Sequence, residues 1–368
     1  MKKLVRLLIT IVLILMLLGA IVVFTASGTY SASKFNNMYY LFGSHIWKVL
    51  VAIALLFLIP LLPYDYYRKY SKYILMIAAC LLIVTLFMPR YKGASRWIEL
   101  SFIGFQPSEI VKIAVIIHIA KLIEKKGDLI SDFKKGFMYC LFWVLFVCTL
   151  LFFQPKVSDA LIIAITSFSI LYVGGARLKH IIFTALSFGT PAVLLMFLIK
   201  HTRERILTFY ESFINGGDAN IQVMQAKIAL GSGYWLGVGL GHSRQSDLFL
   251  PESYGDFIFS IIGEELGFIG AALVLILYLV LFIAALIIAK KAQDKFGQLL
   301  AFGLAVNIMM SVIVNTAVVI GLIPTTGITL PFISFGGTSI MIFAVSVGII
   351  INVANQSLKT SELKLAQV

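Results

Sequence analysis

The residues with the clearest capacity for chemistry are charged side chains that stand at the ends of long apolar segments. Asp256 comes directly before an apolar run that starts at Phe257. A carboxylate in this position either caps the N-terminus of a helix or serves as a general base at the boundary between water and lipid, and one residue can do both. The spacing by itself favours the cap.

Glu109 and Lys112 form a second charged group, close to the start of the apolar run that follows Gln106. Pro107 suits the first turn of a helix, and an acid suits the positive end of the helix dipole. Residues three apart lie on one face, so the two side chains can form an ion pair. Because ionisable groups inside a membrane span are costly unless they are paired, the pair is interpreted either as a structural element or as a charged wall of a cavity open to the outer leaflet.

Several basic side chains near these positions are candidates for binding a phosphate group. Arg96 precedes Trp97, an arrangement whose default interpretation is an interfacial anchor. The sequence shows no His or Cys group with metal-ligand spacing and no recognisable Ser-His-Asp signature. The polar residues 200–256 contain the remaining basic candidates and one further acid: Arg203, Arg205, Arg244 and Glu252.

Two features of residues 200–256 concern the backbone. Residues 219–230 place Ile221, Met224 and Ile228 at helical spacing, which predicts an amphipathic helix on the membrane surface. Glycines then recur through 231–241. This pattern is not a nucleotide-binding fingerprint, because no strand precedes it. It predicts tight turns or a close approach of the backbone to a ligand.

The composition dictates what must position these groups. Of the 368 residues, 60% are hydrophobic and 13% are charged, which is too little polar surface for a soluble body of this size. The bilayer must therefore surround most of the chain, which we interpret as one integral membrane domain over residues 1–368. Topological anchoring and attraction to anionic lipid explain the net charge of +13, so no nucleic-acid partner is expected.

Hydropathy predicts an all-α polytopic membrane protein with about ten transmembrane helices. The first apolar run is longer than that of a signal peptide and is expected to be a retained span. Asn307 and Asn315 lie inside the ninth run and are expected to bridge helices. The predicted spans are 4–26, 46–64, 73–89, 107–123, 137–153, 159–175, 181–199, 257–289, 298–321 and 337–355.

The distribution of Lys and Arg sets the orientation of these spans. When the spans alternate from a cytoplasmic N-terminus, most basic residues fall in cytoplasmic links. Both termini are therefore predicted to be cytoplasmic, and residues 200–256 form a long extracytoplasmic loop between the seventh and eighth helices. The eighth run, 257–289, would be about 50 Å long as a helix, against a ~30 Å hydrocarbon core. We expect 257–266 to lie in the outer interface or to protrude, and the span itself to begin near Gly267.

The order of several motifs resembles the FtsW/RodA (SEDS) family of bacterial cell-wall polymerases, and the resemblance covers nearly the whole chain. Residues 31–33 and the Thr-Leu-Pro within 327–337 are more like FtsW, the division member, than RodA, the elongation member. The motifs are Gly93 to Trp97, Phe105 to Lys112, Gln154-Pro155, Arg203 with Arg205, Gln225 to Gly241, Leu250 to Glu252, Asp256 to Phe259, Gly263 to Gly267 and Pro324 to Gly337.

The resemblance implies a peptidoglycan glycosyltransferase that polymerises lipid II in the bacterial cytoplasmic membrane and, for an FtsW-like member, at the division septum. It implies that Asp256 is the essential carboxylate, that Glu109 and Lys112 lie beside a central cavity, and that Arg96 lies near its mouth. The implied partners are a class B penicillin-binding protein, which is a transpeptidase, and other divisome proteins. The implied cofactor is a divalent cation, Mg²⁺ or Mn²⁺, with no organic cofactor.

The chain departs from the family pattern at two positions. After Gln-Pro, family members usually carry an acid followed by Gly-Thr, whereas this chain has Lys156, Val157, Ser158 and Asp159. The charge at the first of these positions is reversed, and Asp159 partly replaces the missing acid. FtsW members often have Lys where this chain has Thr326. Both differences bear on detailed contacts with substrate.

Other functions fit parts of the sequence. A flippase for a lipid-linked precursor would suit many spans with charges inside them, but no inverted repeat is present and the charges gather on one side of the membrane. A scaffold that only recruits a transpeptidase would have no need of Asp256. Within the family, an elongation polymerase of the RodA type is the alternative to a division polymerase.

Overall fold

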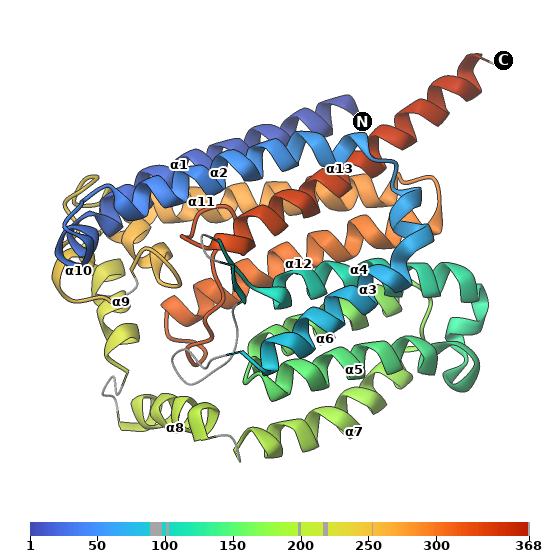
Figure 1. Cartoon of the computed structure of the whole chain (residues 1–368), viewed down its shortest axis with the longest axis horizontal. Coiled ribbons are helices and arrows are strands. Elements are labelled where there is room, and N and C mark those ends of the chain that lie inside the picture. The colour runs from blue at the N-terminus through green and yellow to red at the C-terminus, as the bar shows by residue number, and fades with distance from the viewer. Residues whose placement is uncertain (89–97, 101–102, 198–199, 216–219, 252, 367–368) are drawn as a thin grey trace.

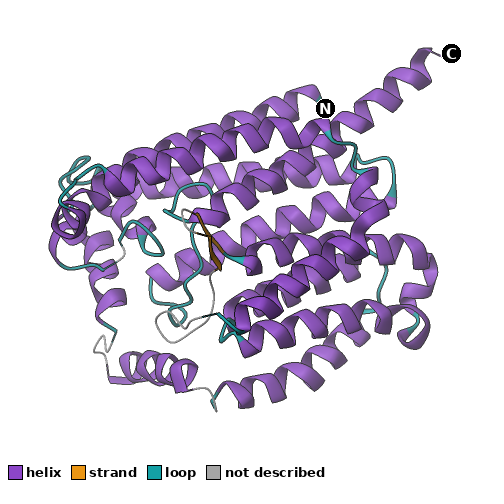
Figure 2. Ribbon diagram, viewed as in Figure 1, coloured by secondary structure: helices purple, strands orange, loops and turns teal. Residues whose placement is uncertain are grey.

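The computed structural model describes residues 1–88, 98–100, 103–197, 200–215, 220–251 and 253–366. Within these residues the chain is a bundle of long helices (Figure 1), and Figure 2 shows one small strand pair among them. The strands β1 (Ile98–Leu100) and β2 (Ile103–Phe105) pair antiparallel, with Ile98 opposite Phe105. The helices are α1 (Lys2–Phe35), α2 (Tyr40–Leu58), α3 (Asp65–Leu86), α4 (Pro107–Lys126), α5 (Met138–Phe153), α6 (Val157–Val173), α7 (Leu178–Met196), α8 (Lys200–Asn215), α9 (Ile221–Ser232), α10 (Arg244–Leu248), α11 (Ile258–Lys290), α12 (Lys295–Val319) and α13 (Gly337–Ala366). Three single turns complete the list: η1 (Ile59–Leu61), η2 (Gly127–Ser131) and η3 (Phe133–Phe137).

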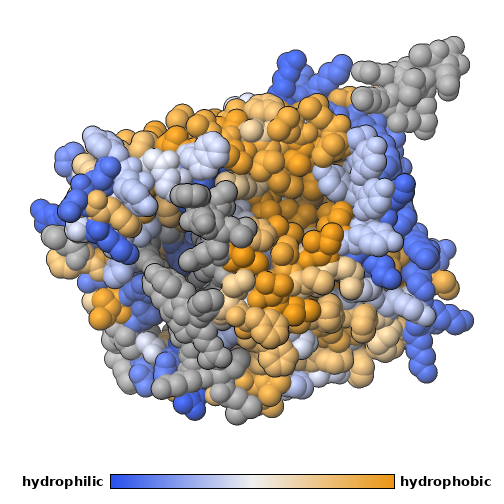
Figure 3. All heavy atoms as spheres, viewed as in Figure 1, coloured by the Kyte–Doolittle hydropathy of each residue, from blue (hydrophilic) through white to orange (hydrophobic). Residues whose placement is uncertain are grey.

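The predicted polytopic helical membrane fold is confirmed. In the described residues, 8 helices are long and apolar enough to cross a membrane. The other two predicted spans also form helices within the bundle, α4 and α6. They are not among the eight because α4 carries charges at both ends and α6 has only 17 residues. Figure 3 shows apolar side chains over the middle of one face and hydrophilic side chains gathered at its two ends, as a bilayer requires.

Some helices are longer than the predicted spans, because hydropathy detects only the part of a helix that lies in hydrocarbon. One such difference is in α1, which continues to Phe35 although the predicted span ends at 26. This extension packs against the segment that precedes α11, since the ring centroids of Tyr30 and Tyr254 lie 5.5 Å apart. The extension of α1 therefore supports the polar end of the bundle.

The two termini lie at the same end of the bundle, and the segment that contains α8, α9 and α10 lies at the opposite end (Figure 1). This arrangement agrees with termini on one side of the membrane and the long loop on the other. Which side is cytoplasmic stays a prediction. Residues 221–232 form the predicted helix, α9, which packs against α11 and buries Ala226 and Ala229.

The long helix α11 is broken at Gly267, where the sequence predicts that the span begins. Gly267 has φ 69° and ψ −172°, outside the helical region. In the preceding turns, Ile258, Ile261 and Glu265 are almost wholly buried by other segments of the protein. The position of residues 257–266 relative to the membrane stays a prediction.

The glycine-rich residues 231–241 fold over the break in α11. The amides of Val238 and Gly239 donate to the carbonyl oxygens of Glu264 and Glu265 at 2.9 and 3.1 Å, and the amide of Phe268 donates to a loop carbonyl. These bonds satisfy backbone groups that a broken helix leaves unpaired. The predicted tight turns are present, but the close approach is to the backbone of α11: a β-carbon on Gly237 would lie 2.1 Å from the Glu265 carbonyl oxygen.

Candidate functional site

A cavity of about 810 Å³ lies among the helix ends opposite the termini. This volume is typical of a site for a sizeable ligand. Its wall comes from the starts of α4, α6 and α13, the end of α7, the side of α8 and two connections between helices. The lining residues are Gln106, Glu109, 155–159, Leu161, Val193, Met196, Thr202, Arg205, Ile206, 254–256, 323–329, 335–337 and Ser339.

Asp256 lines this cavity but does not cap α11. The helix begins at Ile258, Phe257 occupies the N-cap position, and no side chain caps it. The cap interpretation is therefore wrong, because the chain turns once more before the helix starts. The backbone of Asp256 is held instead by Asn315 of α12, whose Nδ2 donates to the carbonyl oxygens of Asp256 and Ile328, both at 2.8 Å.

Arg205 brings a positive charge to the cavity from α8. Its Nη1 donates to the carbonyl oxygen of Thr325 at 2.9 Å, which fixes the guanidinium beside the 323–329 connection. Burial lowers the pKa of Arg205, and the charge of Asp256 opposes this shift. A guanidinium stays protonated despite such a shift, so the cavity holds a cation and a carboxylate that act on each other.

Gly327, in the same connection, lies beside the Asp256 side chain. A β-carbon on Gly327 would lie 3.6 Å from Oδ2 of Asp256, so the carboxylate lies against the turn at Gly327, where φ is 77°. Three chain segments far apart in sequence therefore meet here: α8, the turn before α11, and the connection between α12 and α13.

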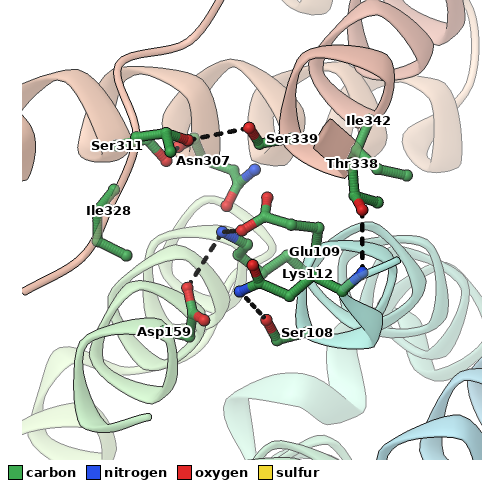
Figure 4. Close-up of polar contacts among 12 residues, drawn as sticks. Ser108, Glu109, Lys112, Asp159, Asn307, Ser311, Ile328, Thr338, Ser339 and Ile342 are labelled. Carbon is green, nitrogen blue, oxygen red and sulfur yellow. Dashed lines mark hydrogen bonds and ion pairs between the residues drawn. The ribbon is translucent and has the colours of Figure 1, made fainter. Parts of the chain in front are cut away.

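A buried ion network forms another part of the wall. Figure 4 shows Lys112 between Glu109 and Asp159, with Nζ at 2.7 Å from Glu109 Oε1 and 3.2 Å from Asp159 Oδ1. Lys156 extends the network, with Nζ at 3.1 Å from Asp159 Oδ2 and 3.0 Å from Ser108 Oγ. Glu109, Lys156 and Asp159 line the cavity, whereas Lys112 lies behind them and is 2% exposed.

The network leaves some polar atoms unsatisfied. The second carboxylate oxygen of Glu109, Oε2, is buried and has no hydrogen-bond partner. Both side-chain polar atoms of Asn307 are also buried and without a hydrogen-bond partner. Figure 4 shows the Asn307 amide directed toward the Glu109–Lys112 pair. The expectation that these asparagines bridge helices is not met by the described residues: Asn315 ties α12 to two connections, at Asp256 and Ile328, and Asn307 makes no side-chain hydrogen bond with the described residues.

The chain is similar in sequence to known proteins along nearly its full length. A family model for cell cycle proteins of the FtsW/RodA/SpoVE group matches residues 5–359. The chain belongs to this family. A relative in Geobacter sp. (strain M18), named "Probable peptidoglycan glycosyltransferase FtsW", is 34% identical over 348 residues, which are 93% of this chain and 94% of the relative. The "Stage V sporulation protein E" of Bacillus subtilis (strain 168) is 34% identical over 355 residues, 95% of this chain and 97% of that protein.

Solved structures show the same FtsW/RodA fold. The rod shape determining protein RodA of Thermus thermophilus superposes with a TM-score of 0.70 at 22% identity, over 95% of this chain and 96% of that one. A chain from a structure titled "Structural coordination of polymerization and crosslinking by a peptidoglycan synthase complex" gives a TM-score of 0.77 at 23% identity, over 95% and 97%. At this level of identity the likeness concerns the fold.

In this FtsW/RodA family member, the structure brings together three of the predicted site residues in one cavity, namely Asp256, Glu109 and Arg205, with Lys112 directly behind. Arg203 and Arg244 are exposed and do not line the cavity. The remaining two candidates, Arg96 and Glu252, lie outside the described residues.

Sequence reasoning noticed Lys156 and Asp159 but did not place them in the site. Their i, i+3 spacing after Gln154-Pro155 repeats that of Glu109 and Lys112 after Gln106-Pro107, and this repetition was the available signal. Residues 324–329 were recognised only as part of a family motif, and Ile323 was not recognised. Their place in the cavity depends on the pairing of Asn315 with the Ile328 carbonyl, which no local pattern predicts.

Proposed function

We propose that this protein is a peptidoglycan glycosyltransferase that polymerises lipid II into glycan strands during septal cell-wall synthesis in bacterial cell division. The observation that carries the proposal is the cavity at the end of the bundle opposite the termini, with the Asp256 carboxylate and the Arg205 guanidinium in its wall. The names of the FtsW relatives support both the reaction and the division role.

The chemistry follows from the charges. An acceptor sugar hydroxyl attacks the anomeric carbon of the donor sugar, a glycosidic bond forms, and the bond from that carbon to the diphosphate oxygen breaks. Asp256 takes the hydroxyl proton as general base. The diphosphate leaves as an anion and needs no proton, so one carboxylate suffices, unlike the two of a glycoside hydrolase. Attack from the side opposite the leaving group inverts the anomeric centre.

The departing diphosphate requires positive charge. Arg205 is the first choice for this task because its guanidinium lines the cavity and is fixed by the Thr325 carbonyl. A planar guanidinium suits two phosphate oxygens at once. Lys156 also lines the cavity, but it shares its charge with Asp159, so its role is to balance that acid.

A divalent cation, as the family resemblance implies, would take most of its ligands from the substrate. The described residues contain no group of three His, Cys, Asp or Glu side chains placed to hold a metal ion. Both oxygens of Asp159 already contact lysines. Since Mg²⁺ is commonly bound by one or two carboxylates plus substrate phosphates, Asp256 is the cavity carboxylate that would face such an ion, which would neutralise diphosphate charge.

The partners follow from the same proposal. The superposed chain comes from a complex whose title joins polymerisation with crosslinking, which supports a class B penicillin-binding protein as the transpeptidase partner. A place at the division septum, with other divisome proteins, follows from the FtsW-like motifs and the names of the relatives. A RodA-like role in elongation is the alternative, supported by the RodA fold match.

The test is a polymerisation assay with lipid II and purified full-length protein. Asp256→Asn should lower the polymerisation rate by about 10²–10⁴-fold, the usual contribution of a general base, without changing the thermal unfolding midpoint. Glu211→Gln is the matched control, because Glu211 is an exposed acid on α8 that does not line the cavity. Full polymerase activity in Asp256→Asn would refute the assignment. Flipping of lipid II in liposomes without polymerisation by the wild type would establish the flippase instead.

A further inference from the structure

Lys48 is a charged residue inside α2, an otherwise apolar helix that crosses the membrane. Its side chain is half-buried, and it forms no ion pair with any carboxylate of the described chain. An unpaired cation in such a helix is costly, and this cost is a reason to look for a missing anion.

Lys48 is surrounded by an aromatic ring, the start of α13 and a buried histidine, and none of these supplies an anion. Its Nζ lies 4.3 Å from the centroid of the Phe335 ring, and a β-carbon on Gly337 would be 3.8 Å from the same atom. One helical turn earlier, His45 is 0% exposed, and neither of its ring nitrogens has a hydrogen-bond partner. The His45 ring also contacts Phe335, at 5.8 Å between centroids.

Gly337 is the first residue of α13. The first amides of a helix have no partner within it, and its N-terminus carries partial positive charge. A cation is therefore unfavourable here unless an anion joins it. The Lys48 ammonium and the start of α13 therefore both favour negative charge at the same place.

The site lies on the far side of the cavity wall. Phe335, Gly336 and Gly337 line the cavity that contains Asp256 and Arg205, while Lys48 approaches Phe335 and Gly337 from α2. The neighbouring residues on α2 are apolar and exposed, with Trp47 at 60% and Leu50 at 57%. A lipid that lies along α2 could therefore place its hydrocarbon chain against the exposed apolar side chains and its charged headgroup against Lys48.

We propose that Lys48, next to the start of α13, binds a phosphate group of a lipid in the outer half of the membrane. The ligand class is a lipid with a phosphate headgroup, which is either a polyprenyl diphosphate or a glycerophospholipid. If it is the former, and this part rests on the proposed function, Arg205 and Lys48 hold the diphosphates of two lipid-linked sugars on the two sides of residues 335–337. A polymerase that joins two such substrates needs two such positions.

The experiment measures binding in the Asp256→Asn protein, so that turnover does not interfere. Full-length protein is placed in nanodiscs of zwitterionic lipid and titrated with undecaprenyl diphosphate or, separately, with phosphatidylglycerol. Lys48→Met should weaken the binding of one of these probes about tenfold, the loss expected for one charge-assisted hydrogen bond. Lys48→Arg should retain most of the affinity. Lys34→Met is the control, since Lys34 is an exposed cation at the end of α1.

The two probes distinguish the sources. A loss confined to undecaprenyl diphosphate supports a substrate position, and a loss confined to phosphatidylglycerol supports a structural phospholipid. Equal affinities of the Lys48→Met and parent proteins for both probes would overturn the proposal. Because Lys48→Met removes a charge from an apolar helix, it should fold at least as well as the parent protein, which its unfolding midpoint checks. Polymerisation by the wild type is measured separately, so a failure of the proposed function is distinguishable from a failure here.

Discussion

Two polar regions lie at the end of this bundle opposite the termini, and the carboxylates of the two regions differ in their surroundings. At the break in α11, Glu264 accepts hydrogen bonds from Ser243 Oγ and, at 3.1 Å, from the Arg244 amide. Glu265 accepts from the Gly241 amide at 3.0 Å and from Thr25 Oγ1 at 2.9 Å. Both glutamates are buried and bound by neutral donors of the protein itself.

The cavity is arranged in the opposite way. Asp256 faces about 810 Å³ of open space with Arg205 nearby, and Glu109 keeps one buried oxygen without a partner. Buried polar groups are normally satisfied within the fold, so unsatisfied ones mark where a ligand completes the structure. The comparison teaches that the acids at the helix break are held by hydrogen bonds within the fold, whereas at the cavity Glu109 keeps one oxygen that a ligand could engage.

The largest effect on this comparison is expected from Gly237→Ala. At this position φ is 81°, and the new β-carbon would lie 2.1 Å from the Glu265 carbonyl oxygen. The loop would have to leave the helix break and lose the bonds from Val238 and Gly239. Adding about 1–2 kcal/mol for the left-handed conformation to about 1 kcal/mol for each of the two lost bonds, we expect a loss of about 3–4 kcal/mol, seen as a lower thermal unfolding midpoint in detergent.

Gly231→Ala provides the matched control. Gly231 lies within α9, and no atom lies within 4 Å of its β-carbon position. Alanine favours a helix over glycine by up to about 1 kcal/mol, so this variant should be as stable as the wild type or slightly more so. Equal destabilisation by both substitutions would show that the loop does not depend on its contact with the break.

Arg205→Met should have the next largest effect, and it should appear in activity. The substitution removes the cavity cation fixed by the Thr325 carbonyl. Loss of a charged hydrogen bond to a phosphate is worth about 1.5–3 kcal/mol, which corresponds to about 10- to 150-fold in the polymerisation rate at low lipid II concentration. Stability should fall by no more than about 1 kcal/mol.

Arg203→Met is the control for this prediction, because Arg203 is exposed on the same helix and does not line the cavity. Its polymerisation rate should stay within about twofold of the wild type, as expected for a distant screened charge. A loss in Arg203→Met as large as that in Arg205→Met would mean that the substrate contacts the outer face of α8 rather than the cavity.

These two arginines also show where sequence reasoning reaches its limit. Both were candidates, but residues two apart on a helix point about 200° away from each other, so only one can face the cavity. Which one does so is decided by the docking of α8 against the Thr325 carbonyl. The choice therefore depends on a contact between segments separated by 120 residues in the chain.

The helices themselves were largely predictable, because each apolar run must form its backbone hydrogen bonds internally. The break at Gly267 also followed from length, since 33 helical residues exceed the hydrocarbon thickness. The burial of Glu264 and Glu265 could not be predicted in this way, because it requires residues 231–244 to fold back onto the break. The ion pair of Glu109 with Lys112 followed from spacing, while its link to Asp159 needed the packing of α6 against α4.

The smallest effect is expected from Glu264→Gln, which makes the same chemical change as Asp256→Asn eight residues later in the chain. The amide oxygen can still accept from the Arg244 amide, but the amide nitrogen cannot accept from Ser243 Oγ. We expect a loss of about 1.5 kcal/mol of stability, the lower range for a charged hydrogen bond, and an unchanged polymerisation rate per folded molecule. Asp256→Asn should show the reverse, with stability kept and activity lost. A loss of activity in stably folded Glu264→Gln would place the acids of the break in the reaction and remove the distinction between the two regions.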